Sequence, residues 1–416
     1  MDNLPAVKTK FIFLSFFSLI FISLIGVAFG QNQQFVSAPV RVDPETNRIF
    51  IIDSQNSQFF IFDAEKQKIV LRIEVAQAPI GMALNSQTGM IYVLSEKYGN
   101  VTVIDSKNGK KIAVFITGEA PKSIMVNEKT NKVYVANYGD NTLSIINVGD
   151  SSIKKIEAGQ GPTLLAADQE ENLIFVVNEI NRELHILDAA TEEKIAQWPL
   201  GLWPKGLVAD AVNKRIYISN FLDDSVTILD YSDPKALKQE NLKTGKGPFR
   251  MVADINSREL YVVNYSDAYL SVFDKQGREK SKIELGEKII SFIFNQFAGQ
   301  IYAVGKDEPA KLKIYDIASR NLNELTLAAP ISGLASVVKN EKIYASQFID
   351  GRLNLAVIDA KTKKVDYYPL VYKDFIYENR MILAGAGILV LLIAVVIIIY
   401  LFFIKKERAD RFGQPA

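Results

Sequence analysis

Short runs of alternating hydrophobic and polar residues recur along most of the chain. In one copy the runs cover residues 123–126, 132–137, 141–147 and 153–156, and Asn, Asp or Gly residues separate them. Such alternation, with many β-branched and aromatic side chains, predicts half-buried β-strands. The unit of four strands returns about every 42 residues, a period typical of repeat architectures. An aromatic residue marks the second strand of every unit: Phe50, Tyr92, Tyr134, Phe175, Tyr217, Tyr261, Tyr302 and Tyr344.

Four antiparallel strands per unit, repeated along the chain, predict an all-β fold, a β-propeller with one blade per unit over residues 31–374. Eight units predict eight four-stranded blades, and seven remain an alternative if a terminal unit is irregular. All four strands can be read in the first and last units, so we expect closure without a strand borrowed from the N-terminus. The periodic aromatic residue should pack between neighbouring blades, and Asn or Asp at strand ends should form Asx turns.

The most hydrophobic run is Met381 to Ile404, which contains no charged residue. A helix of this length spans a hydrocarbon core about 30 Å thick. A short linker, residues 375–380, precedes it. The tail, residues 405–416, begins with Lys405 and Lys406, which is typical of a cytoplasmic flank. The sequence therefore predicts a single C-terminal transmembrane helix.

The N-terminal segment, residues 1–30, combines Lys8 and Lys10 with an apolar stretch and ends in Ala28-Phe29-Gly30. These features predict a secretory signal peptide, and an uncleaved signal anchor is the alternative. Both interpretations place the propeller on the extracytoplasmic side of a cell membrane and the C-terminal tail in the cytoplasm.

Composition excludes several kinds of partner and cofactor. The 48 Lys and Arg residues are balanced by 47 Asp and Glu residues, so no excess of positive charge favours nucleic acid. The chain contains no cysteine, which excludes disulfides, thiolate metal sites and covalently attached haem. His185 is the only histidine and cannot alone supply a copper or catalytic zinc centre. We therefore predict neither a metal nor a cofactor.

Two repeated strings carry a resemblance to a known family. Residues 133–137 (VYVAN) and 260–264 (LYVVN), with residues 141–147 (NTLSIIN) downstream of the first, resemble the YVTN β-propeller repeat found in archaeal surface-layer proteins and bacterial envelope proteins. The resemblance implies an extracytoplasmic propeller that mediates interactions. No copy spells the family string literally, because other residues replace its Thr: Ala136, Val177, Ser219 and Val263.

Residues for a partner-binding site are expected in two sets of loops, those between blades and those between the second and third strands. In a propeller both sets lie on one face around the central channel. Aromatic residues beside Arg or Lys are typical of protein-binding surfaces. The candidates are Lys122, Tyr138, Trp203, Lys205, Phe221, Phe249, Arg250 and Tyr265.

Each candidate has a simpler interpretation. The recurrence of Tyr138 at one position of the repeat favours packing over a blade edge. Trp203 differs because no other unit has Trp there. Lys122, Lys205 and Arg250 could attract an anion at the channel mouth, or be solvated loop charges.

Three further residues or motifs suggest specific chemistry. His185 is expected on the solvent side of its strand, where a catalytic role has no supporting nucleophile motif. Asp223-Asp224 could bind calcium, but a turn explains it better because calcium needs six or more oxygen ligands. Asn100, in Asn100-Val101-Thr102, matches a glycosylation acceptor in an expected exposed hairpin loop.

Three functional hypotheses follow. We prefer a non-enzymatic interaction or scaffold module that binds a protein partner in the cell envelope or in a membrane complex. A calcium-dependent, lactonase-like hydrolase is the alternative. A redox propeller carrying haem, copper or a quinone is the third, and the lack of cysteine argues against it.

Overall fold

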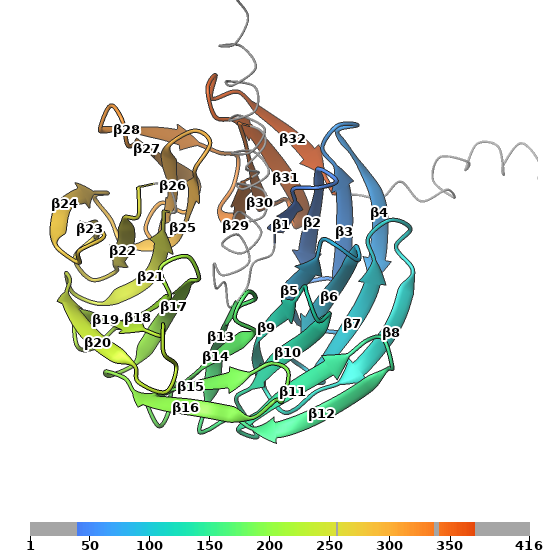
Figure 1. Ribbon diagram of the computed structural model, residues 1–416. Coiled ribbons are helices and arrows are strands. Elements are labelled where there is room, and N and C mark those ends of the chain that lie inside the picture. Colours follow the sequence, from blue (N-terminus) through green and yellow to red (C-terminus); the bar gives the residue numbers. More distant parts are fainter. Residues whose placement is uncertain (1–39, 255–256, 337–340, 371–416) are drawn as a thin grey trace, which may run out of the picture. The chain divides into compact units, whose positions relative to one another are not determined.

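The computed structural model describes residues 40–254, 257–336 and 341–370. These residues form eight antiparallel four-stranded sheets, and each sheet takes four consecutive strands of the chain. The sheets follow one another around a ring, with the first strand of each nearest the centre and the fourth at the rim (Figure 1). The eight-bladed all-β propeller predicted from the repeat is therefore confirmed.

The strands divide among the blades in chain order. Blades 1 and 2 contain β1 (Val40–Asp43), β2 (Arg48–Asp53), β3 (Gln58–Asp63), β4 (Lys68–Glu74), β5 (Pro79–Asn85), β6 (Met90–Ser95), β7 (Asn100–Asp105) and β8 (Lys111–Ile116). Blades 3 and 4 contain β9 (Pro121–Asn127), β10 (Lys132–Asn137), β11 (Thr142–Asn147), β12 (Ser152–Glu157), β13 (Pro162–Asp168), β14 (Leu173–Asn178), β15 (Glu183–Asp188) and β16 (Lys194–Pro199). Blades 5 and 6 contain β17 (Pro204–Asp210), β18 (Arg215–Asn220), β19 (Ser225–Asp230), β20 (Lys238–Lys243), β21 (Pro248–Ala253), β22 (Leu260–Asn264), β23 (Tyr269–Phe273) and β24 (Glu279–Glu284). Blades 7 and 8 contain β25 (Ile289–Asn295), β26 (Gln300–Gly305), β27 (Lys311–Asp316), β28 (Asn321–Thr326), β29 (Ile331–Ser336), β30 (Lys342–Ile349), β31 (Arg352–Asp359) and β32 (Val365–Pro369).

The ring closes by packing between blades and not by a shared sheet. The innermost strand of blade 1, β1, contacts the innermost strand of blade 8, β29. Blade 8 is itself complete, with the strand order β29-β30-β31-β32. Closure is therefore sequential, as predicted.

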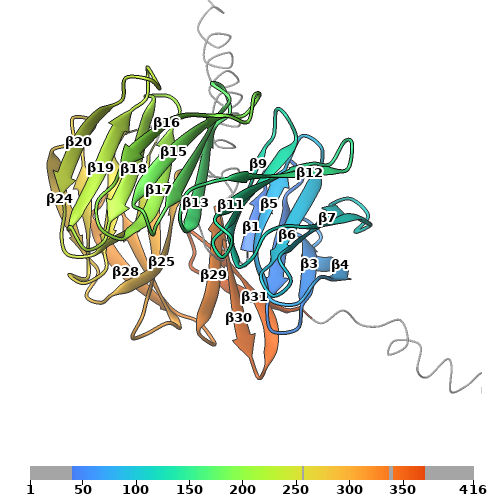
Figure 2. The same cartoon turned by 90° about the horizontal axis from the view of Figure 1, so that it is seen from below.

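The hydrophobic core lies between neighbouring sheets, which stand face to face in the side view (Figure 2). The periodic aromatic residue is buried in all eight blades. Tyr134 of blade 3, for example, packs with Leu165, Ile174 and Val176 of blade 4. Each blade thus buries one face against the next, and a single unit could not form this core alone.

Asx turns hold the tight connections between strands. After strand β9 the side chain of Asn127 accepts a hydrogen bond from the Lys129 amide at 3.1 Å. After strand β7 the carboxylate of Asp105 accepts one from the Lys107 amide at 2.7 Å. The recurring Asn and Asp residues therefore end strands through their own side chains, as their positions predict.

Four predicted segments lie outside the described residues. They are the signal segment 1–30, the linker 375–380, the membrane helix 381–404 and the tail 405–416. Within the described part of the chain, the structure contains no helix that is both long and apolar enough to cross a membrane.

Candidate functional site

The loops between blades and the loops after the second strand of each blade are joined by backbone hydrogen bonds. The amide of Phe221 donates to the carbonyl of Trp203 at 3.1 Å, and the amide of Tyr265 donates to that of Gly247 at 2.9 Å. Tyr138 makes the same bond to Ala120 at 3.2 Å. Both sets of loops therefore share one face of the ring, as predicted. We call the face formed by these loops the upper face.

Four of the predicted aromatic residues form a connected row on the upper face of blades 5 and 6. The ring centroids of Trp203 and Phe221 are 5.2 Å apart, with the planes at 74°. Phe221 and Tyr265 are 6.3 Å apart, and Tyr265 and Phe249 are 6.2 Å apart. We call these four residues the aromatic row. Two of the three contacts are edge-to-face, and aromatic pairs at such distances contribute about 0.5–1.5 kcal/mol each, so ring-to-ring contacts hold the row together.

Cations lie over three of the four rings. Lys205 Nζ is 4.4 Å from the Trp203 ring centroid, and the Arg250 guanidinium carbon is 5.3 Å from that of Phe249. Lys288 Nζ is 5.6 Å from the Tyr265 ring. Burial lowers the pKa of Arg250 to about 10. Lys288 was not predicted from the sequence, although it occupies the position in blade 7 that Trp203 occupies in blade 5.

Trp203 is unusually large for its backbone conformation. It has a φ of 56°, in the left-handed region, and its side chain is exposed, with 43% of its surface accessible. Other blades place Ala120, Gly161 or Gly247 in the same left-handed position. A bulky residue in this conformation is strained by about 1–2 kcal/mol, and such strain concentrates at functional sites.

Trp203 also has defined partners in blade 4. Its indole Nε1 donates to Glu179 Oε1 at 2.5 Å, and Lys205 pairs with the same carboxylate at 2.8 Å. Glu179 occupies the loop position at which blades 3, 5 and 6 have Tyr138, Phe221 and Tyr265. At the junction of blades 4 and 5, therefore, the loop between the blades supplies the large ring, Trp203, and the loop after the second strand of blade 4 supplies a carboxylate, Glu179.

Two of the predicted aromatic residues cover blade edges. A Cβ on Gly161 would lie 3.0 Å from the Tyr138 ring, and a Cβ on Gly247 would lie 3.0 Å from the Phe221 ring. Each ring thus packs on a glycine of the following blade, as the simpler interpretation predicts. The structure shows no ring contact between Tyr138 and the aromatic row within the described residues.

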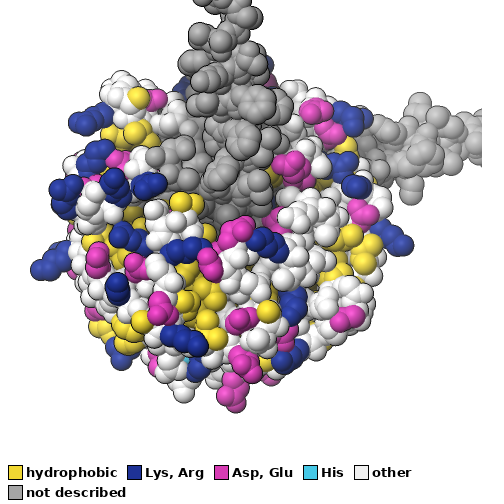
Figure 3. Space-filling model, viewed as in Figure 1, with side chains coloured by type: hydrophobic (Ala, Val, Ile, Leu, Met, Phe, Trp, Pro, Cys, Tyr) yellow, Lys and Arg dark blue, Asp and Glu magenta, His cyan; other side chains and the backbone are white. Residues whose placement is uncertain are grey.

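The predicted ring of cations is partly neutralised. Lys122 pairs with Glu96 at 2.7 Å and lies 6.0 Å from the Tyr138 ring. Lys205 pairs with Glu179. Charges of both signs are also interspersed over the face seen in Figure 3. These pairs weaken the case for an anion-binding ring.

Exposed aliphatic residues extend the aromatic row. Leu222 is 59% exposed and Leu202 is 42% exposed, and a backbone hydrogen bond of 3.2 Å joins the two loops. Ile180, in the corresponding loop of blade 4, is also exposed. These three residues were not predicted, because loop residues have no alternation to mark them. They could have been identified because they are large apolar residues in loops where polar residues are common.

Two expectations about polar residues were wrong. His185 is buried rather than solvent-facing, with Nε2 at 3.1 Å from Glu183 Oε2, and burial lowers its pKa. The loop before blade 4 covers this side of the strand, since a Cβ on Gly159 would lie 2.9 Å from His185 Cε1. Asn100 is the first residue of β7 and is only 6% exposed, so it does not lie in an exposed hairpin loop. This position does not favour glycosylation.

The carboxylates of Asp223 and Asp224 accept hydrogen bonds from backbone amides. Asp223 Oδ2 accepts a hydrogen bond from the Leu202 amide at 2.6 Å, and Asp224 Oδ1 accepts one from the Gly247 amide at 2.8 Å. Their carboxylates thus join neighbouring loops, which agrees with the turn interpretation. Within the described residues there is no group of three or more His, Asp or Glu side chains placed to hold a metal ion.

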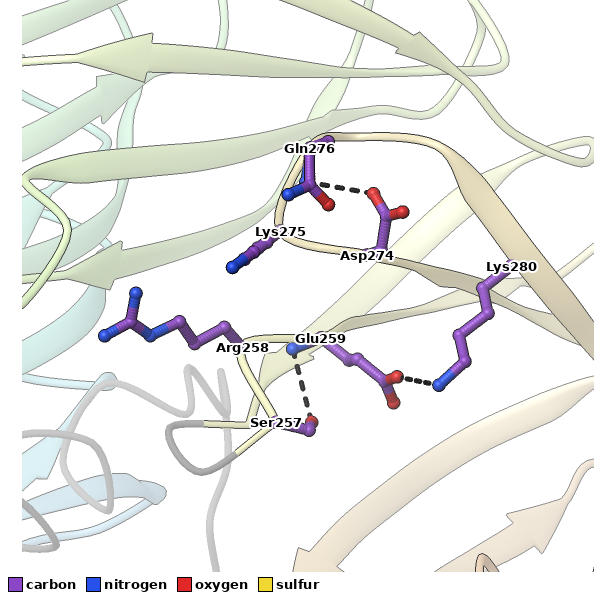
Figure 4. A pocket seen from close by; sticks show the side chains of 7 residues that line it. All are labelled: Ser257, Arg258, Glu259, Asp274, Lys275, Gln276 and Lys280. Atoms are coloured by element: carbon purple, nitrogen blue, oxygen red, sulfur yellow. Dashed lines mark hydrogen bonds and ion pairs between the residues drawn. The ribbon is translucent and has the colours of Figure 1, made fainter.

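An open hollow of ≈ 460 Å³ lies at turns of blade 6, away from the aromatic row. Figure 4 shows its lining: residues 257–259 from one turn, Asp274, Lys275 and Gln276 from the other, and Lys280 from strand β24. Glu259 forms an ion pair with Lys280, and Asp274 accepts a hydrogen bond from the Gln276 amide at 2.9 Å. Because these carboxylates already have partners, the hollow is a weaker candidate than the upper face.

Comparisons with known proteins give the fold and no more. No family model matches the chain, and no curated protein matches its sequence. Among solved structures, it is similar to the dihydro-heme d1 dehydrogenase NirN in complex with DHE, with a TM-score of 0.69 and 16% identity over 81% of this chain and 76% of that one. It is also similar to apo AztD from Citrobacter koseri, with a TM-score of 0.61 and 15% identity over 77% of this chain and 93% of that one. A third similar structure is Kuenenia stuttgartiensis hydrazine synthase, with a TM-score of 0.52 and 16% identity over 70% of this chain and 96% of that one. At such identities the likeness concerns the propeller alone, because one propeller fold hosts unrelated functions.

Proposed function

We propose that this protein is a non-enzymatic interaction module whose docking surface is the upper face of blades 5 and 6. The observation that carries the proposal is Trp203. It combines a strained backbone, a large exposed side chain and a break in the repeat, and it stands at the end of the aromatic row. Fold stability alone would favour glycine there.

The chemistry of the surface suits a protein partner. Trp, Tyr and Arg are the residues that most often dominate protein–protein binding energy, and rigid rings lose little entropy on binding. Leu202 and Leu222 supply exposed apolar area beside the row, and Lys205 and Lys288 supply hydrogen-bond donors above the rings. A mixed surface of this type fits a polypeptide segment that is apolar with an acidic flank.

We also propose that residues 381–404 anchor the propeller on the extracytoplasmic side of the membrane. The support is the uncharged run itself and the Lys405-Lys406 pair that follows it. Carbonate washing of membranes should leave the full-length protein in the pellet, and external protease should digest the propeller in intact spheroplasts. Release by carbonate would contradict the anchor.

Site-specific photo-crosslinking in native membranes tests the docking surface. A photoreactive residue replaces Leu222 on the upper face or, as the matched control, Val212 at a turn of blade 5; the two are 59% and 51% exposed. We expect a discrete adduct from position 222 and none from position 212. Equal adducts from both positions, or none from position 222, would contradict the proposal.

A further inference from the structure

The outer strand of blade 2, β8, has an apolar exposed edge. It pairs only with β7 in the described sheet, so its other edge presents free backbone N–H and C=O groups. Ile112, Val114 and Ile116 are 43%, 56% and 64% exposed. They alternate along the strand, so they project as one row at the rim of the ring.

Four of the other seven outer strands carry a charge in this place, and the remaining three have Gln197, Asn241 and Tyr367 there. At the position of Val114, where the partner on the third strand is Thr102, blade 3 has Lys155 and blade 6 has Lys282. Charged side chains on an edge strand prevent it from pairing with another chain. Strand β8 has no charged residue after Lys111 and therefore lacks this protection.

We propose that β8 pairs with β8 of a second copy of this chain, antiparallel and about a two-fold axis at Val114. In that register Val114 faces its own copy, and Ile112 of each strand faces Ile116 of the other. The row is therefore self-complementary, as a two-fold interface requires. The pairing also satisfies the backbone groups along the free edge.

The charges at the ends of the strand fit the same arrangement. Lys110 and Lys111 stand at its start, and Glu119 follows its end; all three are exposed. Antiparallel pairing brings the lysines of each copy toward the carboxylate of the other, whereas parallel pairing brings like charges together. A β-bulge at Ile112 interrupts the pairing with β7, and the contact between the two copies is centred on Val114. A single strand pair is smaller than a standard stable interface, so we expect a weak association.

Disulfide trapping of the full-length protein in its membranes tests this pairing. The natural chain has no cysteine, so Val114→Cys introduces a single thiol. Residues directly opposed in antiparallel strands have Cβ atoms about 4.5–5.5 Å apart, close to the spacing that a disulfide needs. Lys155→Cys, at the same position of β12, is the matched control.

We expect mild oxidation to give a covalent dimer of Val114→Cys at a yield at least tenfold above that of Lys155→Cys. Adding Ile116→Asp should abolish it, with no change in the melting temperature of the exposed-site variants. Equal yields from the two cysteines, only monomer, or an adduct with the mass of a different protein would overturn the proposal. Strand β8 belongs to blade 2, so either outcome leaves the docking surface of blades 5 and 6 untouched.

Discussion

Blades 5 and 7 fill the same internal position with opposite chemistry. In blade 5, Asn220 at the end of the second strand donates from Nδ2 to Thr227 Oγ1 at 2.9 Å. In blade 7, Gly305 and Lys313 occupy these two positions. Glu287, from the loop before the blade, turns inward above Gly305 and lies 3.4 Å from Lys313 Nζ. A neutral pair has been replaced by a buried ion pair.

The hydrogen bonds that join the loop before the blade to the loop after its second strand also run in opposite directions in blades 5 and 7. In blade 5 the carboxylate of Asp223 accepts the amide of Leu202. In blade 7 Glu287, at the position of Leu202, accepts the amides of Asp307 and Glu308 at 3.0 and 3.2 Å. The same two loops are joined in each case, from opposite sides. The fold therefore requires that the junction be filled and hydrogen-bonded, and not that particular residues do so.

The strongest test of this comparison is Gly305→Asn, which gives blade 7 the residue of blade 5. A Cβ at position 305 would lie 1.7 Å from Glu287 Cδ, so Glu287 must leave the junction and abandon Lys313. We expect a loss of about 4 kcal/mol in the free energy of unfolding, from overpacking and from the lost hydrogen bonds of the Glu287 carboxylate with the amides of Asp307 and Glu308. Denaturant unfolding measures it.

Replacing all three residues of the blade 7 junction together should restore most of that stability. The triple variant Glu287→Leu, Gly305→Asn and Lys313→Thr gives blade 7 the residues that blade 5 has at these positions, so its loss should fall to about 1 kcal/mol because residues in contact couple strongly. A triple variant less stable than Gly305→Asn alone would show that the two junctions are not equivalent.

Single substitutions in the two blades should differ in their cost. Lys313→Met leaves Glu287 charged and buried without its cation, at a cost of about 3 kcal/mol. Thr227→Val removes one neutral hydrogen-bonding hydroxyl from blade 5, at a cost of about 1 kcal/mol. Paired unfolding curves under identical conditions give both values. Equal losses would mean that the ion pair is no more demanding than the neutral pair.

A smaller effect should appear in the pH dependence. The hydrogen bond and charge of Lys313 lower the pKa of Glu324, whose Oε1 is 2.7 Å from Lys313 Nζ. A carboxyl group with a lowered folded-state pKa stabilises the fold above its ordinary value of 4.5, and this stabilisation is lost as the pH falls through the lower, folded-state pKa. Because Glu324 is 42% exposed, the loss should be below about 1 kcal/mol.

Unfolding curves at pH 7 and pH 3 check this effect. Wild type should lose more stability than Glu324→Gln over this interval, and the difference should disappear when Lys313 is also replaced by Met. An identical acid response in wild type and Glu324→Gln would contradict the assigned cause.

The period of the sequence was enough to predict the blades, their order and the buried aromatic residues, because strand alternation and turn residues are local signals. The side of the strand on which His185 lies was predicted wrongly. The small polar residues that replace it elsewhere, such as Ser144 and Thr227, gave no sign that both faces of the strand are covered, yet both are buried.

The contacts of the candidate site depend on distances between blades, which no single repeat contains. Trp203 was identifiable because it breaks the repeat, whereas the contact of Phe221 with Tyr265 arises only when blades 5 and 6 meet. The junction of blade 7 was missed, although Glu287, Gly305 and Lys313 all depart from the repeat together. Such coordinated departures mark residues that touch.

The comparison extends to Trp203, where blade 5 keeps a strained bulky residue and blade 6 keeps Gly247. Trp203→Gly relieves the left-handed backbone and loses the contacts with Phe221 and Glu179, so the melting temperature should change little. The most direct measurement is the yield of the Leu222 photo-adduct in this variant relative to the protein with Trp203. We predict that the adduct is lost while the fold is retained. An adduct of undiminished yield would contradict the assignment of the upper face of blades 5 and 6 as a docking surface built on Trp203.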